Sequence, residues 1–266
     1  MTAVQNPPAV APGVEPQRPT VRGGIPLWRL TQVELRKLAD TRAGLWLLIV
    51  IALAAAATAA ILLAAAPAEE QNYEELLSFG LLPASILLPV LGILSMTSEW
   101  SQRTALTTFT LVPARGKIIA AKLIAAVLIA IATTAAAAIL SAAGNLVAIG
   151  TGGDGSWHLE GALVGQLLVN QIVFVLMGSA FGALLMNSPL AIVLYFAIPT
   201  LWSVLGEMIK GLRTAAGWVD INMTSVPLSE PGMTGNEWLR FGVAALIWVA
   251  LPLALGTVRV LRREVS

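Results

Sequence analysis

Residues 161–206 read GALVGQLLVNQIVFVLMGSAFGALLMNSPLAIVLYFAIPTLWSVLG and contain no Asp, Glu, Lys or Arg. A helix needs about 20 apolar residues to cross the hydrocarbon core of a bilayer, and an ionised side chain at mid-depth costs a few kcal/mol. The stretch is about twice as long as one crossing needs, and Asn187, Ser188 and Pro189 interrupt it near its middle. Such residues favour a tight turn. We therefore predict two spanning helices, over about 161–186 and 189–206.

Four other apolar runs predict four more spans, over about 44–66, 77–98, 118–146 and 241–259. The fold class is thus an all-α integral membrane protein with six transmembrane helices. Residues 207–240 form a polar and aromatic outer segment before the last span.

Two of these runs have irregular features. Pro83 and Pro89 lie inside the second span and predict kinks, because proline removes a backbone donor. The third run stays uncharged beyond the length of one crossing, so its end should protrude or bend near Gly144 and Asn145.

The composition agrees with a membrane protein, since 57% of the residues are hydrophobic and 12% are charged, against roughly 25% charged in soluble domains. Cysteine is absent, which excludes disulfides and thiol chemistry, and His158 is the single histidine. Asp154, His158 and Glu160 are too weak a pattern to predict a metal site. The TGGDG segment at Thr151 lacks the lysine of a phosphate-binding loop. We predict no catalytic, cofactor or metal residues, and the chain is not expected to be an enzyme by itself.

The distribution of Lys and Arg predicts the orientation, because cytoplasmic segments are enriched in them. With the N-terminus inside, only Lys210, Arg213 and Arg240 fall outside. Those on the inner side are Arg18, Arg22, Arg29, Arg36, Lys37, Arg42, Arg103, Arg115, Lys117, Lys122, Arg259, Arg262 and Arg263. Both termini are therefore expected in the cytoplasm.

The residues before the first span divide into two parts. Residues 1–26 are rich in Pro, Gly and Ala and predict a disordered cytoplasmic tail without the apolar core of a cleavable signal peptide. Residues 27–42 predict an amphipathic interfacial helix, which either only anchors the chain or also touches a cytoplasmic partner. Its candidate functional residues are Trp28, Glu34, Arg36 and Lys37.

The segment TSEWSQRTALTTFTLVPARGKIIAAK, from Thr97 to Lys122, predicts a polar helix, a stop at Pro113 and the start of the third span. Glu99 and Arg103 have the spacing of an ion pair on one helix face, so a capping pair is the plain structural interpretation. The other candidate residues of this segment are Thr104, Thr107, Pro113 and Arg115.

This segment resembles the cytoplasmic loop of ABC-2 type transporter permeases in Glu99, Thr104, Pro113 and Arg115, which run on into Lys122. The resemblance extends over about residues 28–263, through the interfacial helix, the six spans and the long fifth connection. It implies that the loop between spans 2 and 3 forms a cytoplasmic coupling helix that docks on an ATP-binding subunit.

The resemblance also implies partners and a location. We expect cytoplasmic ABC ATPase subunits that hold ATP and Mg, a second permease chain in a homodimer or heterodimer, and the lipid bilayer; nucleic acid is not expected. The implied activity is export of a drug, lipid or peptide-like substrate. The Ala-rich spans are typical of a GC-rich bacterium, so we expect the bacterial cell membrane.

Polar groups inside the spans need partners, because lipid offers none. Thr133, Thr134, Asn170 and Gln171 are the candidates for a substrate pathway, with plain interhelical hydrogen bonds as the alternative. Gly161/Gly165 and Gly178/Gly182 have GxxxG spacing, for close packing within one chain or between two. The competing function is a non-transporting membrane scaffold or assembly factor.

Overall fold

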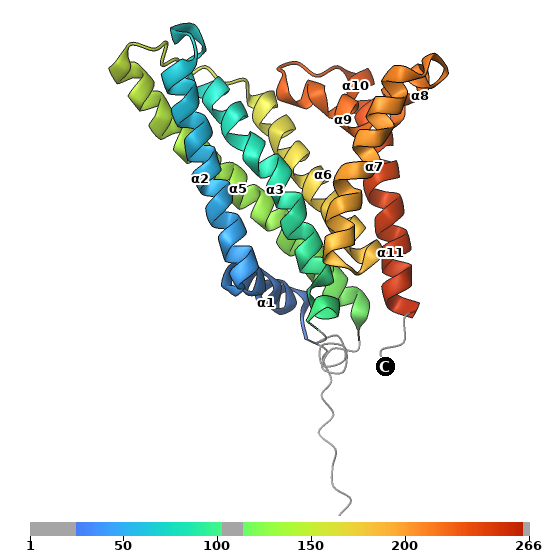
Figure 1. The fold of residues 1–266 in the computed structure, drawn as a ribbon. Helices are drawn as coiled ribbons and strands as arrows, with labels where there is room; N and C mark the ends of the chain where they lie inside the picture. The colour runs from blue at the N-terminus through green and yellow to red at the C-terminus, as the bar shows by residue number, and fades with distance from the viewer. Residues whose placement is uncertain (1–24, 103–113, 263–266) are drawn as a thin grey trace, which may run out of the picture.

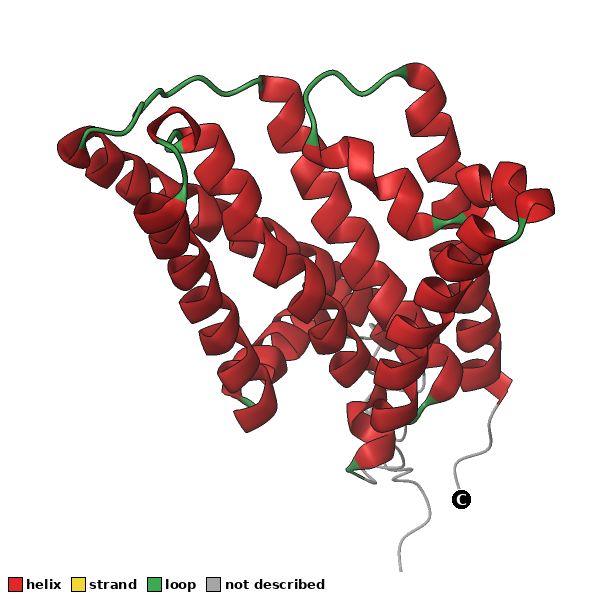
Figure 2. Cartoon of the chain, turned by 45° about the horizontal axis from the view of Figure 1, so that its top comes forward, coloured by secondary structure: helices red, strands yellow, loops and turns green. Residues whose placement is uncertain are grey.

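The computed structural model describes residues 25–102 and 114–262, and helices are the regular elements of these ranges. In chain order they are α1 (Leu27–Asp40), α2 (Arg42–Ala65), η1 (Ala68–Glu70), α3 (Tyr73–Ser101), α5 (Arg115–Thr151), α6 (Gly161–Leu185), α7 (Ser188–Met208), η2 (Lys210–Leu212), α8 (Arg213–Val219), α9 (Ile221–Ser225), η3 (Val226–Ser229), α10 (Gly235–Ala245), η4 (Leu246–Ala250) and α11 (Leu251–Arg262). Figure 2 shows helices and loops and no strand in the described ranges.

Within the described residues, six helices are long and apolar enough to cross a membrane, and this confirms the number predicted. They are α2, α3, α5, α6, α7 and the continuous segment Gly235–Arg262, which combines α10, η4 and α11. By the length and composition of these helices the chain is an all-helical, multi-pass membrane protein.

The molecule has two ends, which Figure 1 separates clearly. At one end, here called the α1 end, lie α1, the C-terminus of α3, the N-terminus of α5 and the C-terminus of α11. The other, the α8 end, carries α8, α9 and the start of α10. The positive-inside pattern predicts that the α1 end is cytoplasmic.

Helices α3 and α6 form the centre of the bundle, because small residues let their backbones approach closely. A Cβ atom at Gly178 would collide with the Pro89 carbonyl, and one at Gly92 would lie 2.6 Å from the Val175 carbonyl oxygen. The pair Gly178/Gly182 therefore packs within the chain. At Gly161 and Gly165, by contrast, a Cβ meets no described atom within 4 Å.

Two helices continue through the residues at which the sequence predicts irregular features. Pro83 and Pro89 both lie inside α3, which runs unbroken from Tyr73 to Ser101. Helix α5 also continues through Gly144 and Asn145 and ends at Thr151. The Asn145 amide is fully buried and donates to the carbonyls of Gly155 and Ser156, which holds the α5–α6 loop.

The turn predicted at Asn187 joins α6 to α7. Met186 has a left-handed backbone, with a φ of 51°, and the side chain of Asn187 accepts a hydrogen bond from the Leu190 N–H at the start of α7. A left-handed C-cap and an Asn N-cap are common helix-ending and helix-starting features, so two residues suffice for the reversal.

Short helices cover the α8 end between α7 and α10. The Asp220 side chain caps α9 by accepting from the backbone N–H of Asn222 and Met223. The buried Gln166 of α6 donates to the carbonyls of Pro227 and Glu230 and so attaches η3 to the bundle.

A π-helical turn, Leu246–Ala250, interrupts the last span. Pro252 lies two residues beyond it and has no N–H for the carbonyl of Trp248, which favours a local change of hydrogen bonding. The side chain of Trp248 makes a separate contact, in which its indole N–H donates to the Val219 carbonyl at 2.6 Å and so links this span to α8.

Candidate functional site

Four charged side chains meet at the α1 end, and we call them the charge cluster: Glu34 and Lys37 of α1, Glu99 of α3 and Lys122 of α5. The Lys122 ammonium lies 2.8 Å from a carboxylate oxygen of Glu34 and 2.8 Å from one of Glu99. The Lys37 ammonium lies 2.7 Å from Glu34 and 3.3 Å from Glu99. Two lysines thus balance two glutamates across three helices.

The cluster is buried except for Lys37. Glu34, Glu99 and Lys122 are each no more than 5% exposed. Lys122 also donates to the Ser95 carbonyl and thereby uses all three of its N–H donors. Glu99 also accepts a hydrogen bond from the Ser98 hydroxyl. Buried ion pairs add little net stability over apolar residues, but removal of one partner is costly. The cluster therefore fixes the relative positions of α1, α3 and α5.

Lys37 is the member that reaches solvent, with 41% of its side chain exposed. Burial lowers the pKa of Lys37, but the hydrogen bond and charge of Glu34 and the charge of Glu99 raise it by more. Its net pKa lies above the ordinary value, and the side chain stays cationic in the physiological range.

The local sequence of α1 explains why Glu34 faces inward. Thr31, Glu34 and Leu38 recur at helical spacing and form the buried face of α1. The chain then turns sharply, and Thr41 caps α2 by accepting from the Gly44 N–H. A Cβ at Gly44 would collide with the Leu38 carbonyl, so the close packing of α1 on α2 requires glycine there.

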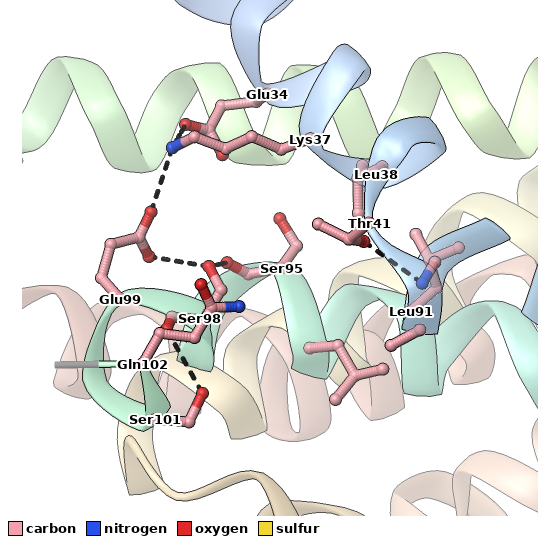
Figure 3. A pocket seen from close by; sticks show the side chains of 13 residues that line it. Glu34, Lys37, Leu38, Thr41, Leu91, Ser95, Ser98, Glu99, Ser101 and Gln102 are labelled. Atoms are coloured by element: carbon pink, nitrogen blue, oxygen red, sulfur yellow. Dashed lines mark hydrogen bonds and ion pairs between the residues drawn. The ribbon is translucent and has the colours of Figure 1, made fainter. Parts of the chain in front are cut away.

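A cavity of about 550 Å³ adjoins the charge cluster between α1, α2 and α3 (Figure 3). Its walls combine Leu91 and Leu94 with polar groups from Thr41, Ser95 and Ser98. Ser95 is 6% exposed, and within the described residues its hydroxyl oxygen has no hydrogen-bond partner.

The residues predicted for the coupling loop have different positions. Glu99 is buried in the charge cluster and bonds to Lys37 and Lys122. Arg115 begins α5, and its guanidinium donates to the Val260 carbonyl of α11 at 3.1 Å. Arg103, Thr104, Thr107 and Pro113 lie outside the described residues, as does the predicted pairing of Glu99 with Arg103.

The four candidate residues of the interfacial helix divide between its two sides. Glu34 and Lys37 join the charge cluster, whereas Trp28 and Arg36 are exposed. Arg29 lies over the Trp28 ring at 5.4 Å. The interfacial position of α1 stays a prediction.

The structure does not bring the predicted pathway residues together. The Thr134 hydroxyl donates within α5 to the Ala130 carbonyl, and the buried Gln171 amide donates to the Leu81 carbonyl of α3. Thr133 lines an apolar cavity between α2, α3 and α5. Asn170 lines a separate cavity near the α8 end.

Lys122 and Ser95 are the site residues that sequence reasoning did not select. In the sequence, Lys122 counts among the positive charges that predict the inner side. Its signal was an isolated lysine in the apolar segment IIAAKLIAA, since a charge at such a depth needs a partner of opposite sign. Ser95 is one of several serines in the chain, and no sequence pattern distinguishes it as a site residue.

Neither the known protein-family models nor the curated proteins contain a match to this sequence.

Proposed function

We propose that this chain is the membrane permease subunit of an ATP-binding cassette transporter of the ABC-2 type, and that it exports its substrate with ATP hydrolysed by separate cytoplasmic subunits. The observation that carries the proposal is the charge cluster. It connects α1 to the C-terminal end of α3 and the N-terminal part of α5, the two helices that flank residues 103–113.

This connection suits the transmission of force from a partner. Separation of Lys122 from both glutamates would leave a buried ammonium without a partner of opposite charge, at a cost of about 3–5 kcal/mol. A cytoplasmic subunit that displaces α1 therefore moves the adjoining ends of α3 and α5 with it. Both helices pass through the bundle, so the displacement reaches the α8 end.

A cavity at the α8 end gives the substrate path a candidate location. It measures about 380 Å³ and lies between α3, α6, α7 and α9, with Asn170, Tyr195 and Asn222 among its lining residues. The buried side-chain oxygen of Asn170 has no partner in the described ranges. Apolar walls with a few polar groups suit an amphipathic substrate, and we propose a drug, a lipid or a peptide-like molecule.

The proposal includes the partners of the chain. A second permease chain, identical or different, would pack against outward apolar faces such as those of α2 and α7, which are mostly unburied. ATP and Mg would bind to the ATPase subunits at the α1 end. We place the complex in a bacterial cell membrane with both termini in the cytoplasm.

Affinity purification from native membranes tests the proposal. The tagged protein is extracted in mild detergent, and the eluate is assayed for ATPase activity and for a subunit with a Walker motif. Arg36→Glu reverses an exposed charge on α1 without touching the charge cluster, and Lys210→Glu is the matched reversal at the α8 end. We expect the ATPase to co-elute with the wild type and with Lys210→Glu, and to be lost with Arg36→Glu.

Two outcomes would contradict this function. Absence of an ATPase from the wild-type eluate, with other membrane proteins in its place, would favour the scaffold hypothesis. Equal loss with both reversals would show that the ATPase does not dock at the α1 end.

A further inference from the structure

The cavity beside the charge cluster presents hydrogen-bond donors to a ligand. Lys37 has three N–H donors and gives two of them to Glu34 and Glu99. The Thr41 hydroxyl accepts from Gly44 and retains its own hydrogen. The Ser95 hydroxyl is nine-tenths buried and unpartnered within the described residues, and Figure 3 shows it on the cavity wall between Glu99 and Thr41.

These groups favour an anion with several acceptor oxygens. The two glutamates and the two lysines sum to zero net charge, and Lys37 is the member of the cluster whose ammonium is partly exposed. A phosphate group fits a lysine ammonium flanked by hydroxyl donors. The cavity also has Leu91 and Leu94 on its walls, so the rest of the ligand is apolar.

A second cavity, of about 450 Å³, lies between α2, α3 and α5. On α2 the first cavity is lined by Gly44 and the second by Leu48, Ile51 and Ala55, which follow at helical spacing. From Gly44 to Ala56 the helix rises by about 18 Å. The second cavity is almost wholly apolar, and alanines of α2 and α5 form much of its lining.

We infer that the two cavities together bind one phospholipid of the leaflet at the α1 end. Its phosphate lies in the first cavity near Lys37, Ser95 and Thr41, and an acyl chain follows α2 into the second. The remaining N–H donor of Lys37, the unpartnered Ser95 hydroxyl and the helical spacing of the lining residues on α2 together favour this occupant. The inference needs no ATPase partner, so it stands or falls independently of the proposed function.

Photolabelling tests the site with a phosphatidylglycerol that carries a diazirine on one acyl chain, in phosphatidylcholine vesicles that contain the full chain. We expect labelling of α2 between Leu48 and Ala56 and of the part of α5 that lines the second cavity. Unlabelled phosphatidylglycerol should compete, whereas diacylglycerol and glycerol phosphate should not.

The variants separate the two halves of the site. Ser95→Val removes the hydroxyl donor, and Ala56→Phe fills the second cavity from an exposed position. Each should reduce labelling about tenfold, which corresponds to about 1.4 kcal/mol. Ala57→Phe places the same ring on the neighbouring exposed position outside the cavity and should leave labelling unchanged.

Three results would overturn the inference. Competition by diacylglycerol would show that the apolar cavity binds any acyl chain without phosphate recognition. Competition by glycerol phosphate would assign the first cavity to a soluble organophosphate. Equal loss with Ala56→Phe and Ala57→Phe would show surrounding bulk lipid only.

Discussion

The Lys122 ammonium lies 2.8 Å from a carboxylate oxygen of Glu99, and both side chains are about 4% exposed. One residue lies near the start of α5 and the other near the end of α3, so the pair joins the two helices on either side of residues 103–113. Glu34 extends the connection to α1 through its own contact with Lys122. The first consequences concern stability.

Replacement of Lys122 by methionine should strongly destabilise the protein. Glu34 and Glu99 would stay buried with one fewer cation, and such a loss costs about 3–5 kcal/mol. The measurement is the unfolding temperature of the detergent-solubilised protein. Lys117→Met removes an exposed lysine from the same helix and should change the stability by less than about 0.5 kcal/mol. Equal effects of the two changes would refute a structural role for the buried pair.

A double-mutant cycle should show that Glu99 and Lys122 are coupled. Glu99→Gln and Lys122→Met each leave the cluster with one unbalanced charge, but the double variant keeps Glu34 with Lys37 and is neutral again. Its cost should therefore be smaller than the sum of the single costs by about 1–3 kcal/mol. Additive costs, measured by the same thermal unfolding, would mean that the contact contributes no interaction energy.

The spans could be predicted because their signal is local. Runs without charge mark the crossings, and the turn at Asn187 follows from residues that end and cap helices. That α3 continues as one helix through both of its prolines could not be predicted in this way. A proline predicts the loss of a backbone donor, whereas the surrounding helices decide whether the helix bends.

The charge cluster could not be predicted from the sequence, because it joins residues of three helices that are far apart in the chain. Lys122 and Glu34 are separated by 88 positions, and no periodicity connects them. Sequence reasoning selected Glu99 for its place in the predicted loop, but the structure gives it buried partners on α1 and α5. Pairing across helices depends on packing, which an isolated sequence does not specify.

Alanine at Gly178 and alanine at Gly165 should have opposite effects on stability. A Cβ at Gly178 would collide with the Pro89 carbonyl, and relief of the collision requires separation of α6 from α3, at a cost of about 2 kcal/mol or more. Gly165 has open space, so alanine there should stabilise the helix by about 0.5–1 kcal/mol. Thermal unfolding in detergent distinguishes the two, and destabilisation by both would indicate that Gly165 contacts a second chain.

The contribution of Lys37 to stability should be lost only in alkaline solution. Its folded-state pKa is raised above the ordinary 10.5, because the hydrogen bond and charge of Glu34 and the charge of Glu99 outweigh the effect of burial. The stabilisation is thus complete below about pH 10.5 and declines as the pH rises through the folded-state pKa. The difference in unfolding temperature between wild type and Lys37→Met should be constant from about pH 6 to 9. It should shrink only at higher pH, as the pH rises through the folded-state pKa of Lys37. A difference that already declines below about pH 9 would contradict the raised pKa.

Replacement of Gln166 by leucine should loosen the short helices at the α8 end without unfolding the bundle. The buried amide donates to the carbonyls of Pro227 and Glu230 at 3.1 and 2.9 Å, and leucine would leave both carbonyls without that donor at a cost of about 1–3 kcal/mol. Hydrogen–deuterium exchange should therefore accelerate in residues 221–230 and stay slow in α3. Ala162→Leu changes an exposed position one turn earlier on α6 and should not affect exchange. Unchanged exchange in Gln166→Leu would mean that contacts such as Trp248 with Val219 are sufficient to hold this end in place.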